Sequence, residues 1–153
     1  MTTRTYNNML DIVLNAFDND LALHSIRVST ALRTTDDELQ TVALGHDLIN
    51  AHAHADTALL LKRGMSNRIV SGIWAMTRQQ GMSMCNYVHQ ICENEDAMPV
   101  AMKCILDSTD PSKPLITSKA YIEEQHLLYL HIADKQRLRK IDNMLHAKNG
   151  THR

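Results

Sequence analysis

The chain has few of the residues that interrupt helices: its 153 residues include only 5 glycines and 3 prolines. Glycine and proline are the strongest local breakers of regular structure, so their scarcity favours helices. Apolar residues recur at helical spacing along most of the chain, and we find no strand pattern. A chain of this length can bury a sizeable core. We therefore predict an all-α fold with one domain over residues 1–153.

The sequence also lacks an excess of charge and a long apolar run. Its formal net charge is -1, so no overall basic field would attract it to nucleic acid or to an anionic membrane, and we expect neither as a partner. No apolar run approaches the roughly 20 residues that span a bilayer. The first residues lack the apolar core of a signal peptide. These features favour a cytoplasmic protein.

Cysteine is scarce as well. The three cysteines, Cys85, Cys92 and Cys104, are odd in number and form no CxxC motif. Such a set indicates neither a disulfide framework nor a cysteine zinc site.

Histidine, by contrast, is abundant, with 9 in the chain, four of which fall between positions 24 and 54. His24 lies in a predicted helix with apolar positions between 23 and 32. His46 and Asp47 lie in the next predicted helix, from about residue 37 to 52. A last long helix is predicted from about 118 to 146, and its basic residues are typical of a solvated face.

Two histidines and an aspartate on neighbouring helices can converge on one divalent cation. His46 and Asp47 point roughly 100° apart on a helix, so both reach a metal only if it lies in the groove between them. Imidazole and carboxylate ligands together suit Mn, Fe, Zn, Co or Ni rather than Ca. The alternatives are a core histidine at His24 with satisfied polar atoms, and a chance His-Asp pair.

These residues lie in segments that resemble a known family. Residues 23–28, Leu-His-Ser-Ile-Arg-Val, are similar to the LHPxRVA stretch of RelA/SpoT-type alarmone hydrolases, which belong to the HD superfamily of metal-dependent phosphohydrolases. Residues 36–49 resemble the DxELxxVALLHDVI segment of the same family. The resemblance covers roughly residues 22–113. It implies an HD-type helical bundle with its core at about residues 20–113, which hydrolyses a phosphate ester or anhydride on a small nucleotide such as (p)ppGpp.

The resemblance also implies a set of metal ligands and a manganese-like ion. The first three ligands would be His24, His46 and Asp47. The last metal aspartate of the family has no unambiguous counterpart: Asp107 is the best candidate carboxylate and Asp110 the second, while one alignment places Cys104 at that position. Two cationic residues are the expected contacts to the substrate phosphate, namely Arg27 and Lys103.

The chain departs from the family directly after the His-Asp pair. Hydrolases of the family continue HDxxED, with a Glu-Asp pair tied to the attacking water, whereas this chain has Asn50 and Ala51 there. Neither of these can serve as a general base. The candidate catalytic residues are therefore Asn50 as a pocket residue, with His52 or His54 as a substitute base; Asp56 is a further titratable group nearby. The alternative is that these downstream residues are an exposed helix end.

Three functions remain open at this point. The first is a metal-dependent phosphohydrolase that acts on a small nucleotide. The second is a catalytically degenerate HD domain that binds a nucleotide or a protein partner without hydrolysis; a homo-oligomer is also left open. The third is a helical interaction module that uses some of its 9 methionines as an adaptable apolar surface.

Overall fold

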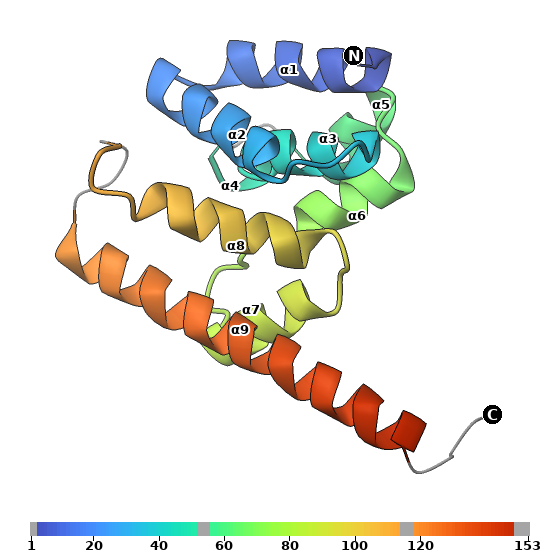
Figure 1. The fold of residues 1–153 in the computed structure, drawn as a ribbon. Coiled ribbons are helices and arrows are strands. Elements are labelled where there is room, and N and C mark those ends of the chain that lie inside the picture. Colours follow the sequence, from blue (N-terminus) through green and yellow to red (C-terminus); the bar gives the residue numbers. More distant parts are fainter. Residues whose placement is uncertain (1–2, 52–55, 114–117, 149–153) are drawn as a thin grey trace.

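The computed structural model describes residues 3–51, 56–113 and 118–148, and these form an all-α single domain. Figure 1 shows the helices stacked around one another, with the last and longest helix extending beyond the rest. In chain order the helices are α1 (Arg4–Ala16), α2 (Asn19–Ala31), α3 (Asp37–Gly45), α4 (Leu48–Ala51), α5 (Thr57–Lys62), α6 (Asn67–Ala75), α7 (Met84–Cys92), α8 (Ala97–Ser108) and α9 (Lys119–Lys148).

Short polar side chains begin most of these helices. In each case a side-chain oxygen accepts a hydrogen bond from a backbone N–H in the first turn, which has no partner within the helix. The residues that cap helices in this way are Thr3, Asp18, Asp36, Asp56, Ser66 and Ser83. These caps set the helix starts and thereby the register of the side chains that each helix turns inward.

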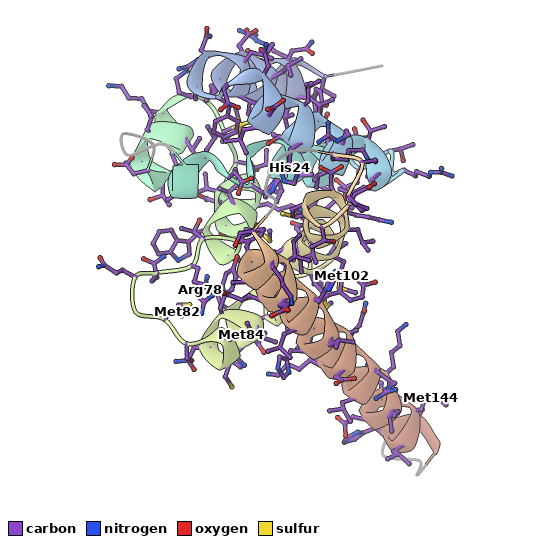
Figure 2. All side chains as sticks on the ribbon, turned by 90° about the vertical axis from the view of Figure 1, so that its left-hand side faces the viewer. His24, Arg78, Met82, Met84, Met102 and Met144 are labelled. Carbon is purple, nitrogen blue, oxygen red and sulfur yellow. The ribbon has the colours of Figure 1, made fainter. Side chains whose placement is uncertain are left out.

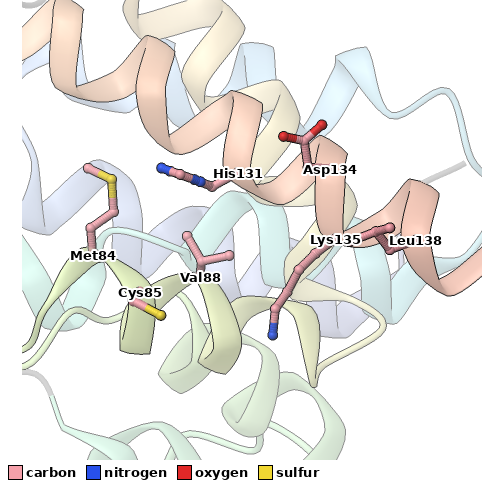
Figure 3. Close-up of a pocket in the computed structure, with 7 residues that line it drawn as sticks. All are labelled: Met84, Cys85, Val88, His131, Asp134, Lys135 and Leu138. Atoms are coloured by element: carbon pink, nitrogen blue, oxygen red, sulfur yellow. The ribbon is translucent and has the colours of Figure 1, made fainter.

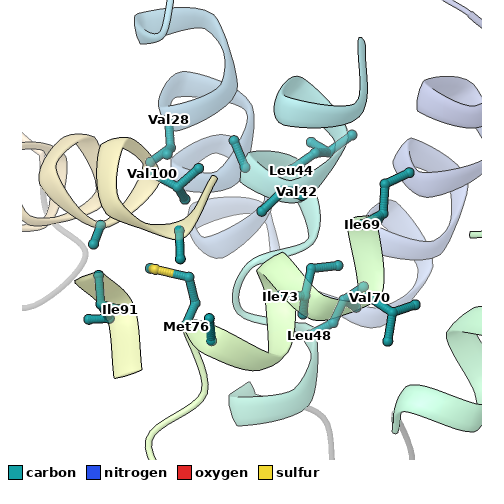
Figure 4. Close-up of a cluster of buried hydrophobic side chains, with 14 of the residues drawn as sticks. Val28, Val42, Leu44, Leu48, Ile69, Val70, Ile73, Met76, Ile91 and Val100 are labelled. Carbon is teal, nitrogen blue, oxygen red and sulfur yellow. The ribbon is translucent and has the colours of Figure 1, made fainter. Parts of the chain in front are cut away.

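Helix α3 lies at the centre of the body and contacts α1, α2, α6 and α8. Its buried Val42 and Leu44 belong to the cluster drawn in Figure 4, together with Val28 of α2, Ile73 of α6 and Val100 of α8. Helix α9 packs against α7 and α8 on the other side. The core therefore holds α2, α3 and α8 in fixed positions relative to one another, and these are the helices that carry the candidate metal ligands.

A glycine allows α6 to approach α3 closely. A Cβ atom at Gly72 would lie 2.8 Å from Cγ2 of Val42, nearer than side-chain carbons approach in real structures. Gly45, the last residue of α3, is similarly tight, since a Cβ there would lie 2.8 Å from Cε of Met9. These two close approaches hold the end of α3, where His46 and Asp47 follow, against the core.

One detail of the fold differs from the sequence prediction. The single helix expected from about residue 37 to 52 is broken at His46 and Asp47, between α3 and α4.

Trp74 of α6 is 43% exposed. In α6 the buried positions are those on either side of it, Ile73 and Ala75, because Trp74 lies on the edge of the apolar face.

No helix in the described ranges combines the length and the apolar character that a membrane crossing requires. The last helix, predicted at about 118–146, runs over Lys119–Lys148.

Candidate metal centre

His24 lies in the middle of α2 and points into the body. Its side chain is 1% exposed, and in Figure 2 its label lies between the upper helices and α8. The helix begins at the Asp18 cap, whose carboxylate accepts a hydrogen bond from the N–H of Leu21 at 2.9 Å. A buried histidine of this kind needs polar partners for both ring nitrogens.

His46 and Asp47 form the two-residue break between α3 and α4. The Nδ1–H of His46 donates a hydrogen bond of 2.6 Å to the carbonyl of Ala43. In an uninterrupted helix that carbonyl would accept from the N–H of Asp47 instead, so the imidazole competes with the helix ladder. The break frees His46 and Asp47 from the roughly 100° separation of helical neighbours, and both side chains turn towards His24.

Cys104 and Asp107 are one helical turn apart on α8, and both lie beside His24. The Sγ atom of Cys104 lies 3.6 Å from Nε2 of His24. Asp107 is on the other side of the same ring, where its Oδ2 accepts a hydrogen bond of 2.7 Å from Nδ1 of His24. The two residues of α8 therefore contact opposite nitrogens of one imidazole.

The nitrogen atoms of two histidines and the sulfur of one cysteine converge on a common point. One ligand atom each from His24, His46 and Cys104 lies within 4.8 Å of the others, and this group could hold a metal ion; the described residues contain no second group of this kind. Asp47 joins it, with Oδ2 at 3.2 Å from Nε2 of His46 and 3.6 Å from Nε2 of His24. When four ligand atoms surround a metal at tetrahedral angles and at about 2.0–2.3 Å from it, they lie roughly 3.3–3.8 Å from one another. The distances between the ligand atoms of this group approach those values.

Hydrogen bonds fix the tautomer of both imidazoles. A carboxylate and a carbonyl can only accept, so Nδ1 of His24 and Nδ1 of His46 must both carry protons. The lone pair of a neutral ring is then on Nε2, which in both residues faces the centre. Metal-binding histidines are commonly oriented by such a donated hydrogen bond from the other ring nitrogen.

One of these Nε2 atoms has no hydrogen-bond partner among the residues that the structure describes. Nε2 of His46 is buried, and although Asp47 is 3.2 Å away, the two groups are not aligned for a hydrogen bond. An unsatisfied buried nitrogen costs free energy comparable to a lost hydrogen bond. Coordination of a cation would satisfy this atom.

The electrostatics of the centre favour a cation. Burial alone would raise the pKa of the Cys104 thiol, but His46 and a hydrogen bond with His24 lower it to about 7. The pKa of Asp47 is lowered, since His46 outweighs the opposing effect of burial. Burial lowers the pKa of His46, yet Asp47 and Cys104 together raise it well above its usual range. Two buried anionic groups thus face two imidazoles, and thiolate is the metal-binding form of cysteine.

Arg27 secures Asp107 from outside the centre. Its guanidinium donates two hydrogen bonds to the carboxylate, from Nε to Oδ1 at 2.8 Å and from the terminal nitrogen to Oδ2 at 3.0 Å. Bidentate pairs of this kind are geometrically specific. The pKa of Asp107 is lowered, because Arg27 and His24 outweigh burial. Arg27, Asp107 and His24 therefore form a continuous chain that ends at the centre.

The structure brings three predicted metal ligands together, namely His24, His46 and Asp47. It places Asp107 differently: this carboxylate binds Nδ1 of His24 and faces away from the shared space, whereas Cys104 faces into it. Asp110 lies outside the centre, where its side chain accepts hydrogen bonds from Ser112 and Lys113. The residue that the structure groups with the two histidines is Cys104, one helical turn before Asp107; that Asp107 or Asp110 completes the site stays a prediction.

The predicted substrate-binding residues line a hollow of about 210 Å³ beside Asp107. Its cationic residues are Arg27, Lys103 and Lys113, and it shares Asp107 with the chain of hydrogen bonds that leads to His24. Lys113 also pairs with Asp110 at 2.8 Å. Arg27 is committed to Asp107 rather than free to bind an anion alone.

The predicted catalytic residues fall at the edge of the described structure. Asn50 is in α4, but its side chain is not among those described, and His52 and His54 lie outside the described residues. Asp56, a further titratable group weighed above, caps α5 by accepting a hydrogen bond of 2.8 Å from the N–H of Leu59. The prediction that His52 or His54 substitutes as a base therefore stays a prediction.

The spacing of the cysteines gave no sign of a metal site at Cys104, which only one alignment with the resembling family placed at the last ligand position. Cys104 has no CxxC partner, and its companions His24 and His46 are distant in sequence. The usable signal was its place in α8, because a position one turn before Asp107 shares a helix face with it. No protein-family model matches the chain, and a search of curated proteins finds no match either.

Proposed function

We propose that this chain is an HD-type domain that binds one transition-metal ion and hydrolyses a phosphate ester or anhydride on a small nucleotide. The observation that carries the proposal is the paired arrangement of His24 and His46. Each ring donates from Nδ1, to Asp107 and to Ala43 respectively, and each directs Nε2 at the same buried point. Such preorientation is characteristic of metal ligands.

The ligand set favours zinc over manganese. Thiolate is a soft ligand that selects Zn, and imidazole suits Zn, Fe, Co and Ni, whereas Mn prefers carboxylate and water oxygens. With Cys104 in place of a carboxylate, the four candidate donors are two imidazoles, one thiolate and the carboxylate of Asp47. We therefore expect Zn²⁺ as the resident ion, and Fe²⁺ or Co²⁺ as substitutes.

A bound ion of this type polarises a phosphoryl oxygen and lowers the pKa of a water ligand. The chain's own residues supply the rest. The Asp47 side chain is 24% exposed, in contrast to the 1% of the two histidines, so the centre opens to solvent on the Asp47 side. The hollow beside Asp107 offers Lys103 and Lys113 as cationic contacts for the phosphate groups of a nucleotide.

A second candidate is a domain that binds a nucleotide without hydrolysing it. One observation favours it: Asn50 and Ala51 stand where the resembling hydrolases have their Glu-Asp pair. If His24, His46, Asp47 and Cys104 all bound one tetrahedral ion, no position would remain for water, as in structural zinc sites. Both candidate functions use the same metal centre. They differ in whether the metal keeps a coordination position open for water.

Phosphate release from the metal-loaded full chain decides between them. We would supply Zn²⁺ or Mn²⁺ and measure turnover of (p)ppGpp, deoxynucleoside triphosphates and nucleoside monophosphates. Release that disappears in a His46→Ala variant, but survives in an Asp11→Ala control on the exposed face of α1, supports the hydrolase. Thermal stabilisation by a nucleotide without release supports the second candidate, since a ligand that binds only the folded state raises its stability. Absence of both bound metal and nucleotide binding rejects both.

A further inference from the structure

Helix α9 has apolar side chains on two opposite faces, and only one of them packs against the body. Leu128 and Ile132 are buried against α7 and α8. On the other side an outer stripe of five residues is exposed, each by 46–62%, namely Leu127, Leu130, Leu138, Ile141 and Leu145. Successive residues of a helix turn by about 100°, which places these five in one sector of about 80°, roughly opposite Leu128 and Ile132.

The spacing of the outer stripe is regular. Leu127 and Leu138 are eleven residues apart, as are Leu130 and Ile141, and the same step links Asp134 to Leu145. An eleven-residue repeat completes three helical turns almost evenly, so the stripe runs nearly parallel to the helix axis. Its length is about 27 Å at 1.5 Å per residue. Repeats of this kind are typical of helices that pair along their length.

The body does not cover this stripe. In Figure 1 the C-terminal half of α9 extends past the other helices, and in Figure 2 Met144 marks its projecting end. Helices in proteins owe most of their stability to packing of an apolar face, whereas Leu138, Ile141 and Leu145 stay 46–62% exposed beside the described residues. Contiguous exposed apolar surface of this kind marks an interaction site.

We propose that the outer stripe pairs with the same stripe of a second copy of this chain, with the two α9 helices antiparallel. Between Leu127 and Leu145, Asp134 is the single polar residue in the sector of the helix surface that the outer stripe occupies. In a parallel pair it would face Asp134 of the second copy, and two carboxylates would be enclosed together. In an antiparallel pair the two-fold axis passes near Gln136. Asp134 of each copy then lies beside Arg137 of the other copy.

Charge complementarity extends along the antiparallel seam. On the other side of the stripe the same axis brings His131 next to Asp142 of the second copy. Within one chain Asp134 and Arg137 are already 3.2 Å apart, with exposed side chains, so pairing converts two surface ion pairs into a network of four charges. The symmetry doubles every contact, as in other two-fold interfaces.

A groove beside the stripe enlarges the surface. Met84, Cys85 and Val88 of α7 and His131 and Leu138 of α9 line a hollow of about 230 Å³, shown in Figure 3. It adjoins the outer stripe at Leu138, which belongs to both. The second copy would therefore bury apolar atoms of α7 as well as of α9. This inference does not depend on the metal centre.

Analytical ultracentrifugation of the full chain tests the proposal. We expect a dimer at about 50 μM, and a double variant, Leu138→Asp with Ile141→Asp, should raise the dimer Kd by roughly 100-fold or more. The matched control is Leu14→Asp, since Leu14 on α1 is similarly exposed, at 54%, and should leave the Kd unchanged. A monomer at about 200 μM, or equal weakening by Leu14→Asp, would overturn the proposal. Binding of the outer stripe to a different protein, without self-association, would also overturn the proposal.

A charge-reversal experiment tests the antiparallel register without depending on apolar substitutions. Asp134→Arg alone and Arg137→Asp alone each place like charges across the seam, and each should weaken its own dimer by about tenfold. An equimolar mixture of the two variants should form a heterodimer of near wild-type affinity. The intramolecular Asp134–Arg137 pair is lost in both variants, so its loss cannot explain recovery on mixing. A dimer unaffected by Asp134→Arg, or no recovery on mixing, would overturn the antiparallel arrangement.

Discussion

The metal centre and the C-terminal half of α9 break the usual distribution of side chains in opposite ways. Around His24 and His46, polar and charged groups are enclosed by the core. Along the outer stripe, leucine and isoleucine side chains face solvent. Globular proteins generally enclose polar groups only when they are paired, and large exposed apolar patches mark interaction sites.

The difference between the two regions lies in their preorganisation. The centre is held from behind by hydrogen bonds, from His24 to Asp107 and from His46 to Ala43, so its ligand atoms are fixed before any ion arrives. No hydrogen bonds of this kind hold the described side chains of the outer stripe, and pairing with a second copy would fix their positions. We therefore propose a different partner for each region: a cation for the first, and a second copy for the second.

The largest contrast between the regions should be in packing energy. Ile73 is fully buried in α6, so Ile73→Ala should lower the free energy of unfolding by about 2–5 kcal/mol through lost burial and a cavity. Met144, 70% exposed at the far end of α9, should change it by no more than about 0.5 kcal/mol when replaced by Ala. Urea unfolding at about 1 μM chain measures both. Equal costs would show that the end of α9 is packed within one chain.

Removal of the metal should have the next largest effect. With zinc at 100 to 1,000 times its Kd, binding to the folded state stabilises the protein by about 2.7–4.1 kcal/mol, and a chelator should abolish this gain. Thermal unfolding with and without chelator measures it. His46→Ala should unfold at the same temperature in both conditions. If neither chelator nor added zinc changed the unfolding temperature of the wild-type protein, the centre would hold no ion.

Loss of the carboxylate behind His24 should weaken the ion's affinity without removing a ligand. Asp107→Ala leaves Nδ1 of His24 without its acceptor and should raise the zinc Kd by about 10–100-fold. Asp107→Asn retains an acceptor oxygen, so its zinc affinity should fall by less. Competition with a chromophoric chelator measures the affinities, and Asp110→Ala serves as the matched control with an unchanged Kd. If Asp107→Ala eliminated zinc binding as completely as His46→Ala, Asp107 would be a ligand.

The smallest expected effect is a change in proton release. Without an ion, the Cys104 thiol is largely ionised at pH 8 and largely protonated at pH 6, because its pKa is lowered to about 7. Zinc should therefore displace more protons at pH 6 than at pH 8, and Cys104 should account for about one of them. His24 and His46, whose pKa values are both raised, add to the protons released. Calorimetry in buffers of different ionisation enthalpy measures this number. In Cys104→Ser the number released at pH 6 should fall by about one; an unchanged number would assign that proton to another group.

The helices could be predicted from the sequence because their signals are local. Apolar spacing and capping residues such as Asp18, Ser66 and Ser83 predict where the helices lie, and the structure has them within a few residues of those positions. The break at His46 could not be predicted in this way. It depends on a side-chain hydrogen bond to Ala43, which competes with the helix ladder only in the folded environment.

The candidate site was predictable only in part. The order of His24, His46 and Asp47 indicated a shared centre, because the pattern is carried on neighbouring helices. The choice between Cys104 and Asp107 could not be made from the sequence, since a few residues on α8 change the direction of a side chain and both residues lie on one face. Their separate roles follow from how α8 packs against α2, which no local pattern specifies.

X-ray absorption at the zinc edge of the purified full chain tests the central claim most directly. We predict one zinc per chain with one sulfur neighbour at about 2.3 Å and nitrogen or oxygen neighbours at about 2.0–2.1 Å, and the loss of the sulfur signal in Cys104→Ser. A chain that takes up no zinc, or zinc surrounded by nitrogen and oxygen alone in the wild-type protein, would contradict a centre built from His24, His46 and Cys104.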